Sequence, residues 1–214
     1  MGVLEIKNVT YSYPNSKEKV LASVNQSFER GKFYAIIGKS GAGKSTLLSL
    51  LAGLDKPKNG QILFEKENIE KKGYSNHRRN NISLVFQNYN LIDYLTPLEN
   101  IRLVNSKAPE SILLDLGLEE SQIKRNVMKL SGGQQQRVAI ARALASEAPV
   151  ILADEPTGNL DEATAGEIIE LLKTMAKERN KCVIVVTHSR EVAAAADVVL
   201  ELGGKKLKQL TNRA

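Results

Sequence analysis

The feature that most constrains the fold is the glycine-rich segment Gly38-Lys-Ser-Gly-Ala-Gly-Lys-Ser45, which matches the pattern G-x-x-x-x-G-K-[ST]. The apolar run before it, 33–37, predicts a buried strand, and the stretch after it, 46–51, predicts a helix that Gly53 can cap. A chance glycine-rich turn would not need this arrangement of strand, loop and helix. The segment therefore predicts an α/β fold with a phosphate-binding loop.

Each part of this loop has a physical reason to hold a nucleotide. Glycines let backbone N–H groups converge on phosphate oxygens, and the helix N-terminus adds partial positive charge. We expect Lys44 to reach the β- and γ-phosphates and Ser45 to offer its hydroxyl to Mg²⁺. The predicted nucleotide-binding residues are Gly38, Lys39, Ser40, Gly41, Ala42, Gly43, Lys44, Ser45 and Thr46. Such loops serve GTPases, kinases, helicases and transporters, so the loop alone leaves the reaction open.

Further apolar runs at 83–86, 150–153 and 182–186 are each followed by polar residues. Near-continuous apolar runs are typical of strands covered on both faces, as in a parallel sheet. Between two of them, Glu162–Glu178 carries apolar residues at helical spacing and predicts an amphipathic helix. The single cysteine, Cys182, lies in the last run, where we expect a small buried hydrophobe and a reducing compartment.

Other segments predict different local structure. The first 35 residues alternate between two faces, and Gln61–Glu65 is another short strand candidate, so we expect a partly antiparallel edge. Residues 88–145 carry no comparable apolar run and are predicted to be helical. Near the end, 198–202 followed by Gly203-Gly204 predicts a hairpin with a two-residue turn.

Two carboxylates stand at the end of one predicted strand. An acidic residue at the carboxyl end of a buried parallel strand faces the ligand crevice, so Asp154 is a candidate for the Mg²⁺ shell. Because side chains alternate along a strand, we expect Glu155 to point differently and to deprotonate an attacking water. In isolation, Asp-Glu-Pro156 could simply start a turn.

Composition excludes some classes of protein. No segment approaches the roughly 18 consecutive apolar residues of a bilayer span, and the first residues lack the regions of a signal peptide. We therefore expect a soluble chain. The net charge of +6 could favour an anionic partner, but lysine-rich faces are usually just solvated, and we expect no nucleic acid partner.

The segment Leu130-Ser-Gly-Gly-Gln-Gln-Gln-Arg137 is similar to the signature sequence of ABC ATPases. It also predicts a capping box, with Ser131 as N-cap and Gln134 at the third helical position. The resemblance implies that two copies pair head to tail, so that the signature of one covers the γ-phosphate held by the other. The residues that it implies act in trans are Ser131, Gly132, Gly133, Gln134 and Asp161.

The remaining motifs of the family follow in order along the chain. Tyr13 looks like the aromatic that stacks on adenine, with Tyr11 as an alternative and an ordinary strand tyrosine as a third interpretation. Gln87 resembles the glutamine that touches Mg²⁺ and the attacking water. Asp161 resembles the residue of the loop that crosses to the partner, and His188 the histidine that contacts the γ-phosphate. A histidine after a strand is otherwise more often structural.

The resemblance thus implies ATP and Mg²⁺ as ligands and an ATPase reaction. Its catalytic residues would be Lys44, Gln87, Glu155 and His188, and its metal ligands Ser45, Gln87 and Asp154. It implies a RecA-like P-loop NTPase core with an antiparallel β edge, formed by 1–87 and 146–214, and a helical subdomain inserted at 88–145. The segments 86–92, 95–100 and 152–161 look like the branch that contains lipoprotein-release, macrolide-export and antimicrobial-peptide ATPases.

This branch implies that the chain drives a separate membrane permease on the inner face of the cell membrane, exporting or extracting a peptide, lipoprotein or amphipathic drug. A further extracytoplasmic or adaptor subunit is left open. The alternative is a regulatory ATPase that moves a membrane protein controlling cell-wall hydrolases. A DNA-maintenance ATPase would need an inserted coiled coil or zinc-binding cysteines, and a small-molecule kinase is opposed by the signature. The apolar connector Tyr89–Glu99 is either a docking groove for the permease or part of the helical packing.

Overall fold

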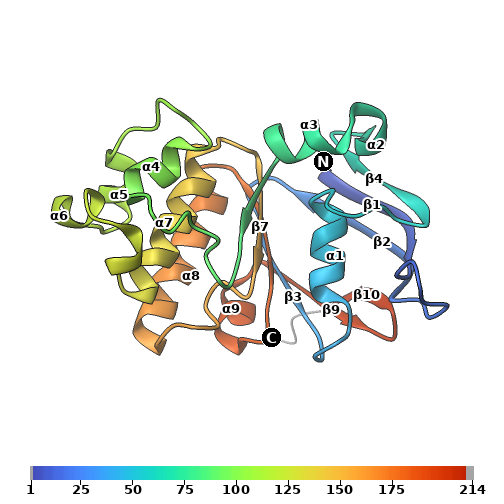
Figure 1. The fold of residues 1–214 in the computed structure, drawn as a ribbon. Coiled ribbons are helices and arrows are strands. Elements are labelled where there is room, and N and C mark those ends of the chain that lie inside the picture. The colour runs from blue at the N-terminus through green and yellow to red at the C-terminus, as the bar shows by residue number, and fades with distance from the viewer. Residues whose placement is uncertain (1, 211–214) are drawn as a thin grey trace.

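The computed structural model describes residues 2–210, which form two β-sheets with helices around them (Figure 1). The larger sheet has six strands in the order β10-β9-β3-β8-β7-β6, and all its neighbouring pairs are parallel except β10 with β9. The smaller sheet has four antiparallel strands in the order β2-β1-β4-β5. The predicted α/β class is confirmed.

The strands of the larger sheet agree closely with the apolar runs. They are β3 (Phe33–Ile37), β6 (Ile82–Val85), β7 (Val150–Asp154), β8 (Cys182–Val186), β9 (Val198–Gly203) and β10 (Lys206–Gln209). Every residue of β8 is buried, as expected for a central strand covered on both faces. Burial also raises the pKa of the Cys182 thiol to about 12, so this cysteine stays a neutral core residue.

Two hydrophobic clusters cover the two faces of this sheet. One contains apolar residues of α1 (Lys44–Leu51) and of the four-stranded sheet, and the other contains those of α7 (Gly132–Ala145) and α8 (Glu162–Lys177). Figure 1 shows α1 between the two sheets and α7 with α8 on the opposite side of the larger sheet. The helix predicted at Glu162–Glu178 is thus confirmed, since Glu178 is the C-cap of α8.

The alternating N-terminal segments form a sheet of their own rather than an edge of the parallel sheet. Its strands are β1 (Gly2–Tyr11), β2 (Leu21–Glu29), β4 (Asn59–Phe64) and β5 (Glu67–Asn68). The reason is that β1 pairs with β2 on one side and with β4 on the other, which uses its backbone groups on both edges. Its buried side chains then pack on α1 instead of extending the larger sheet.

Short helices fill the remaining connections. Next to the four-stranded sheet lie α2 (Ile69–Lys72) and α3 (Tyr74–Asn80), and α9 (Arg190–Ala195) follows β8. Residues 88–145, all of them described, form no strand; they contain α4 (Pro97–Arg102), α5 (Ser111–Asp115), α6 (Glu120–Ile123), the 3-10 helix η1 (Val127–Lys129) and α7. Apolar residues of these helices belong to the same hydrophobic cluster as residues of β7 and β8, so the helices pack directly on the larger sheet.

One predicted turn is displaced. The hairpin between β9 and β10 turns at Gly204-Lys205 and not at Gly203-Gly204, because Gly203 pairs with Lys206 in the ladder. Both turn residues have positive φ, 56° and 67°, as a type I′ turn requires. Among residues 2–210, no helix combines the length and the apolar character that crossing a membrane requires.

Candidate active site

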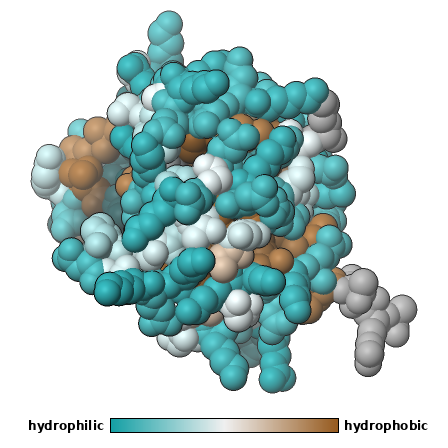
Figure 2. Space-filling view, turned by 90° about the vertical axis from the view of Figure 1, so that its right-hand side faces the viewer, coloured by the Kyte–Doolittle hydropathy of each residue, from teal (hydrophilic) through white to brown (hydrophobic). Residues whose placement is uncertain are grey.

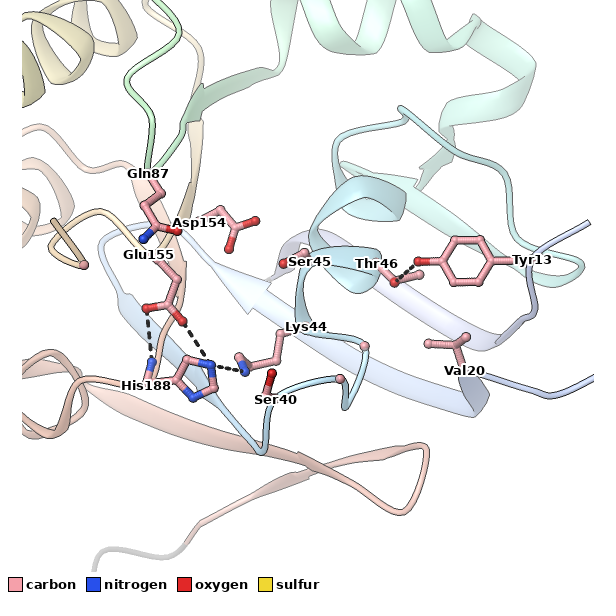
Figure 3. Close-up of a pocket in the computed structure, with 13 residues that line it drawn as sticks. Tyr13, Val20, Ser40, Lys44, Ser45, Thr46, Gln87, Asp154, Glu155 and His188 are labelled. Carbon is pink, nitrogen blue, oxygen red and sulfur yellow. Dashed lines mark hydrogen bonds and ion pairs between the residues drawn. The ribbon is translucent and has the colours of Figure 1, made fainter. Parts of the chain in front are cut away.

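A cleft of about 730 Å³ lies at the carboxyl ends of β3, β7 and β8. Parallel strands end at a common edge, so the residues that follow them meet there although they are far apart in sequence. Figure 3 shows the labelled side chains arranged around this cleft. The predicted site residues that line it are Tyr13, Ser40, Gly41, Gly43, Lys44, Ser45, Thr46, Gln87, Asp154, Glu155 and His188.

The loop between β3 and α1 is shaped by glycine at the position before the helix. Gly43 has a φ of 98° and acts as the N-cap of α1 without a capping side chain. A Cβ atom at Gly43 would lie 2.6 Å from Cγ1 of Val20, closer than any real side chain tolerates. The glycine therefore leaves the first N–H groups of α1 free to face the cleft, where they can bind an anion.

Lys44 is 7% exposed, and its ammonium group is held inside the cleft. Its Nζ atom donates to the carbonyl oxygens of Gly38, at 2.9 Å, and Lys39, at 3.3 Å. A third contact of 3.0 Å joins Nζ to Nε2 of His188. An ammonium has three donors and no acceptor, so a neutral His188 ring accepts here through its Nε2 lone pair. The loop thus holds a positive charge ready for phosphate oxygens.

The two candidate tyrosines differ in accessibility. Tyr13 is 49% exposed, lines the cleft and shares a 2.7 Å hydrogen bond between its hydroxyl and Oγ1 of Thr46. Tyr11 is 2% exposed, and its hydroxyl bonds to Asp55. Burial, together with that hydrogen bond, raises the pKa of Tyr11 to about 12. Of these two rings, the Tyr13 ring lines the cleft and the Tyr11 ring does not.

Asp154 and Ser45 form a pair suited to a hard cation. Burial raises the pKa of Asp154 and the neighbouring Glu155 charge adds to the rise, while a hydrogen bond with Ser45 and the charge of Lys44 oppose it. A divalent cation would favour the ionised form of this carboxyl and so oppose the effect of burial. The described residues contain no group of three or more His, Cys, Asp or Glu side chains that could hold a metal ion by themselves. Mg²⁺ fits such a site, because it is commonly held by one or two protein oxygens together with phosphate oxygens and water.

Glu155 follows the last residue of β7. Its side chain does point differently from that of Asp154, but the cause is the backbone conformation of Glu155 and not the predicted alternation along the strand. Its φ is 46°, a left-handed conformation that turns the chain out of the strand direction. Oε2 accepts hydrogen bonds from Oγ1 of Thr187, at 3.0 Å, and from the backbone N of His188, at 3.2 Å. The carboxylate is therefore fixed at the edge of the cleft (Figure 3).

Gln87 enters the cleft from the segment that follows β6. Its Nε2 donates to Oδ1 of Asn159 at 3.2 Å, and Nδ2 of Asn159 donates to the backbone oxygen of Gln87 at 3.3 Å. The glutamine also lies directly against Gly158, where an added Cβ would be 2.9 Å from its Nε2. The segments after β6 and β7 are thereby tied together next to Asp154.

The residues predicted to act in trans do not line the cleft of their own chain. Ser131 is the N-cap of α7; its Oγ accepts from the backbone N of Gln134, and the Gln134 side chain accepts from the backbone N of Ser131. The predicted capping box is confirmed. Gly132 and Gly133 are the first residues of α7. Asp161 caps α8 through two hydrogen bonds with Thr164, which lower its pKa.

Several residues of the site were not predicted. Val20 lines the cleft from the segment before β2, and no pattern in the sequence singles it out. Thr187 donates a hydrogen bond to the Glu155 carboxylate. Its position directly after β8 could have marked it as a site residue. Asn159 stands in the segment 152–161 that resembles the family branch, but its pairing with Gln87 spans 72 residues and depends on the fold.

Comparison with known proteins identifies the family to which this cleft belongs. The sequence pattern of the ABC transporter family matches residues 21–158, more than half of the chain. The chain belongs to the ABC transporter family. This membership confirms the predicted ABC-type ATPase class and the role of an ATP-binding subunit in a transport complex.

Relatives of similar length agree. YclH of Bacillus subtilis, an uncharacterized ABC transporter ATP-binding protein, is 44% identical over 212 residues, 94% of each chain. The lipoprotein-releasing system ATP-binding protein LolD of Rickettsia bellii is 42% identical, over 94% of this chain and 95% of its own. The predicted resemblance to lipoprotein-release ATPases is therefore confirmed.

The fold agrees with that of MJ0796 from Methanocaldococcus jannaschii, an ABC transporter cassette solved as a dimer. This structure superposes with a TM-score of 0.87 at 38% identity and covers 99% of both chains. MJ0796 has also been solved in a dimeric post-hydrolysis state bound to ADP and Pi, with a TM-score of 0.86. The predicted RecA-like ABC fold is confirmed.

Proposed function

We propose that this chain hydrolyses MgATP in composite sites of a head-to-tail homodimer and thereby drives a separate membrane permease. The observation that carries this function is the row of functional groups from Lys44 through His188 to Glu155 along one edge of the cleft. A γ-phosphate and its attacking water bound at this edge would have a buried cation, an imidazole and a fixed carboxylate within reach. Stabilising charge and positioning the water are the main needs of phosphoryl transfer.

In this proposal, the residues of the cleft divide the work. Lys44 and the N–H groups of the loop hold the phosphates, and the Tyr13 ring stacks on adenine. Asp154, Ser45 and Gln87 would hold Mg²⁺, which would neutralise phosphate charge there. Glu155 takes the proton of the attacking water, and its hydrogen bonds with Thr187 and His188 keep the carboxylate in position.

The second half of each site comes from the partner copy. Ser131 and the N–H groups of Gly132 and Gly133 form a helix N-terminus that does not line the cleft of its own chain and that would accept an anion held by another copy. Dimers of the relative MJ0796 support this arrangement. With two copies, each retained ATP would lie between the phosphate loop of one chain and the signature helix of the other.

The permease is proposed to dock near the exposed apolar residues that follow β6. Within the connector, Leu91 and Leu98 pack against the core, whereas Tyr94 is 81% exposed. Leu103 and Val104, just after α4, are 57% and 48% exposed and border a hollow of about 400 Å³ beside β6. Figure 2 shows that the face built by the four-stranded sheet is mainly hydrophilic, with small and separate apolar areas.

A direct physical link joins this surface to the signature helix. The guanidinium of Arg142, in α7, donates to the backbone oxygens of Tyr89, at 3.1 Å, and Asn90, at 2.6 Å. Movement of the connector by a docked permease would therefore reach α7 as well as Gln87. The cargo class proposed from the family branch is a peptide, lipoprotein or amphipathic drug, and LolD supports a lipoprotein.

The test of the catalytic proposal is hydrolysis by the purified chain in MgATP. Lys44→Ala should lower phosphate release by about a hundredfold or more, because the transferred phosphate loses its main cationic partner. Lys58→Ala, which removes an exposed lysine outside the cleft, is the matched control. Circular dichroism should show both variants folded. Wild-type turnover of the Lys44→Ala protein would refute the assignment of the cleft.

A further inference from the structure

Gln87 and Asn159 form a reciprocal pair of hydrogen bonds beside the proposed metal position. The two contacts are Gln87 Nε2 to Asn159 Oδ1, at 3.2 Å, and Asn159 Nδ2 to the Gln87 backbone oxygen, at 3.3 Å. Gly158 lies under the glutamine amide, since a Cβ there would come within 2.9 Å of Nε2. The glutamine side chain is thus held by one residue and packed on another.

The orientation of both side-chain amides follows from the backbone carbonyl of Gln87, which can act only as an acceptor. A backbone carbonyl can only accept, so the Asn159 amide must turn its Nδ2 towards the Gln87 backbone. Its Oδ1 then faces the Gln87 side chain, and only the Nε2 end of that side chain can donate to it. Oε1 of Gln87 is consequently left on the side of the cleft. Figure 3 shows this oxygen on the side of Asp154.

We propose that Asn159 is a positioning residue that orients the Gln87 amide so that Oε1, and not Nε2, faces Mg²⁺. The inference rests on the proposed function, in which Gln87 is a metal ligand. Mg²⁺ takes oxygen ligands and rejects an amide nitrogen that carries two hydrogens. A glutamine with its amide reversed would present those hydrogens to the cation, so the orientation set by Asn159 decides whether Gln87 can bind.

The expected effect of losing Asn159 can be estimated from the freedom that Gln87 gains. Without the partner amide, two orientations of the amide and about three staggered wells of a side-chain torsion become accessible. The fraction of molecules with Oε1 in place should then fall about sixfold. Binding of ATP through the phosphate loop should not change, because Asn159 does not line the cleft.

The experiment measures kcat and the half-saturating Mg²⁺ concentration at fixed ATP for the full chain. Asn159→Ala should lower kcat and raise the half-saturating Mg²⁺ concentration, so that the ratio of the two falls about sixfold, with ATP affinity within about twofold of wild type. Asn88→Ala, which removes an exposed asparagine next to Gln87, is the matched control and should behave as wild type. Gln87→Ala should show a Mg²⁺ defect at least as large as that of Asn159→Ala.

A rescue separates orientation from a merely structural role. In Gln87→Glu the side chain ends in two equivalent oxygens, so either orientation offers one to Mg²⁺ and no orienting partner is needed. Adding Asn159→Ala to Gln87→Glu should therefore change the Mg²⁺ dependence by less than about twofold. If Asn159→Ala shifts the Mg²⁺ dependence equally in wild type and in Gln87→Glu, the inference is overturned, and this includes a shift caused by misfolding.

Two other results would also overturn it, and they have different meanings. If Gln87→Ala is defective but Asn159→Ala behaves as wild type, the role of Asn159 is wrong while the proposed function stands. If Gln87→Ala itself leaves the Mg²⁺ dependence unchanged, Gln87 is no metal ligand, and both the proposed metal site and the role of Asn159 fail.

Discussion

Glu155 and His188 are in contact at two points, since Oε2 of Glu155 accepts from the backbone N of His188 at 3.2 Å and Oε1 lies 3.5 Å from its Nε2. The carboxylate is thus held from one side, and its Oε1 edge remains directed at the cleft. Nζ of Lys44 lies 3.0 Å from the same Nε2 atom, so the Lys44 ammonium and the Glu155 carboxylate both lie against one nitrogen of the His188 ring.

This geometry predicts that Glu155→Gln becomes a stable dimer in MgATP. Glutamine keeps the size of glutamate but cannot take the proton of water, so ATP persists. Each γ-phosphate then bridges Lys44 of one copy and the Ser131 helix terminus of the other, contacts that ADP lacks. Size-exclusion chromatography with light scattering measures the mass. A folded, ATP-bound Glu155→Gln protein that stays monomeric would contradict the mechanism.

The trans role of the signature predicts that two inactive variants restore each other. Ser131→Ala should bind ATP nearly as well as wild type but lose hydrolysis, because its serine serves the partner's nucleotide. Mixing it with Lys44→Ala should recover part of the activity, since one site of a mixed dimer combines an intact loop with an intact signature. Phosphate release measures the recovery.

The serine is also a helix cap, so its loss should cost about 1 kcal/mol of stability. Ser111→Ala, an exposed serine at the start of α5, is the control for a neutral serine replacement. The trans role would be excluded if the isolated Ser131→Ala chain lost ATP binding as strongly as it loses hydrolysis, or if mixing recovered no activity.

The docking proposal predicts selective uncoupling. Tyr94→Asp and Leu103→Asp should each prevent the membrane partner from co-purifying with the tagged chain, because a charge is placed in an apolar contact. Basal hydrolysis should remain within about twofold of wild type, since neither residue lines the cleft. Leu114→Asp, at an apolar residue of α5 that is 38% exposed, is the matched control. Retention of the partner by both test variants would place docking elsewhere.

His77 predicts a pH dependence of stability. It is completely buried, with Nε2 against the Leu51 carbonyl at 3.0 Å and Nδ1 against Nδ2 of Asn81 at 3.2 Å. Burial lowers its pKa below the ordinary value of 6.5. Below pH 6.5 the unfolded chain binds a proton at His77 that the folded chain does not bind. The stability that depends on the neutral His77 ring is therefore fully present above pH 6.5 and is lost as the pH falls.

Thermal unfolding at about pH 7.5 and about pH 5.5 checks this sign, with a slope of at most about 1.4 kcal/mol per pH unit from one proton. His77→Gln should be less stable overall, yet lose less stability between the two pH values. The exposed His188 is present in both proteins, so its contribution cancels in the comparison. An unchanged pH dependence in the variant would show that His77 is not the titrating group.

The features that sequence reasoning found are those encoded in contiguous residues. The loop Gly38–Ser45, the strand that ends at Asp154 and the capping box at Ser131 each depend on local backbone chemistry, so spacing alone predicts them. The exposed surface behaves differently: the connector's apolar residues look alike in sequence, and only the packing of Leu91 and Leu98 separates them from Tyr94.

The sequence by itself determined that the chain is an α/β nucleotide-binding protein with an ABC signature, because phosphate loops, buried strands and helix caps are local patterns. Only the tertiary structure decided that Tyr13 and not Tyr11 reaches the cleft, that Glu155 is turned by a left-handed backbone, and that Asn159 pairs with Gln87. The physical reason is that these relations join segments whose approach is set by sheet order and helix packing. Contacts between side chains so far apart in the chain leave no periodic trace in the sequence.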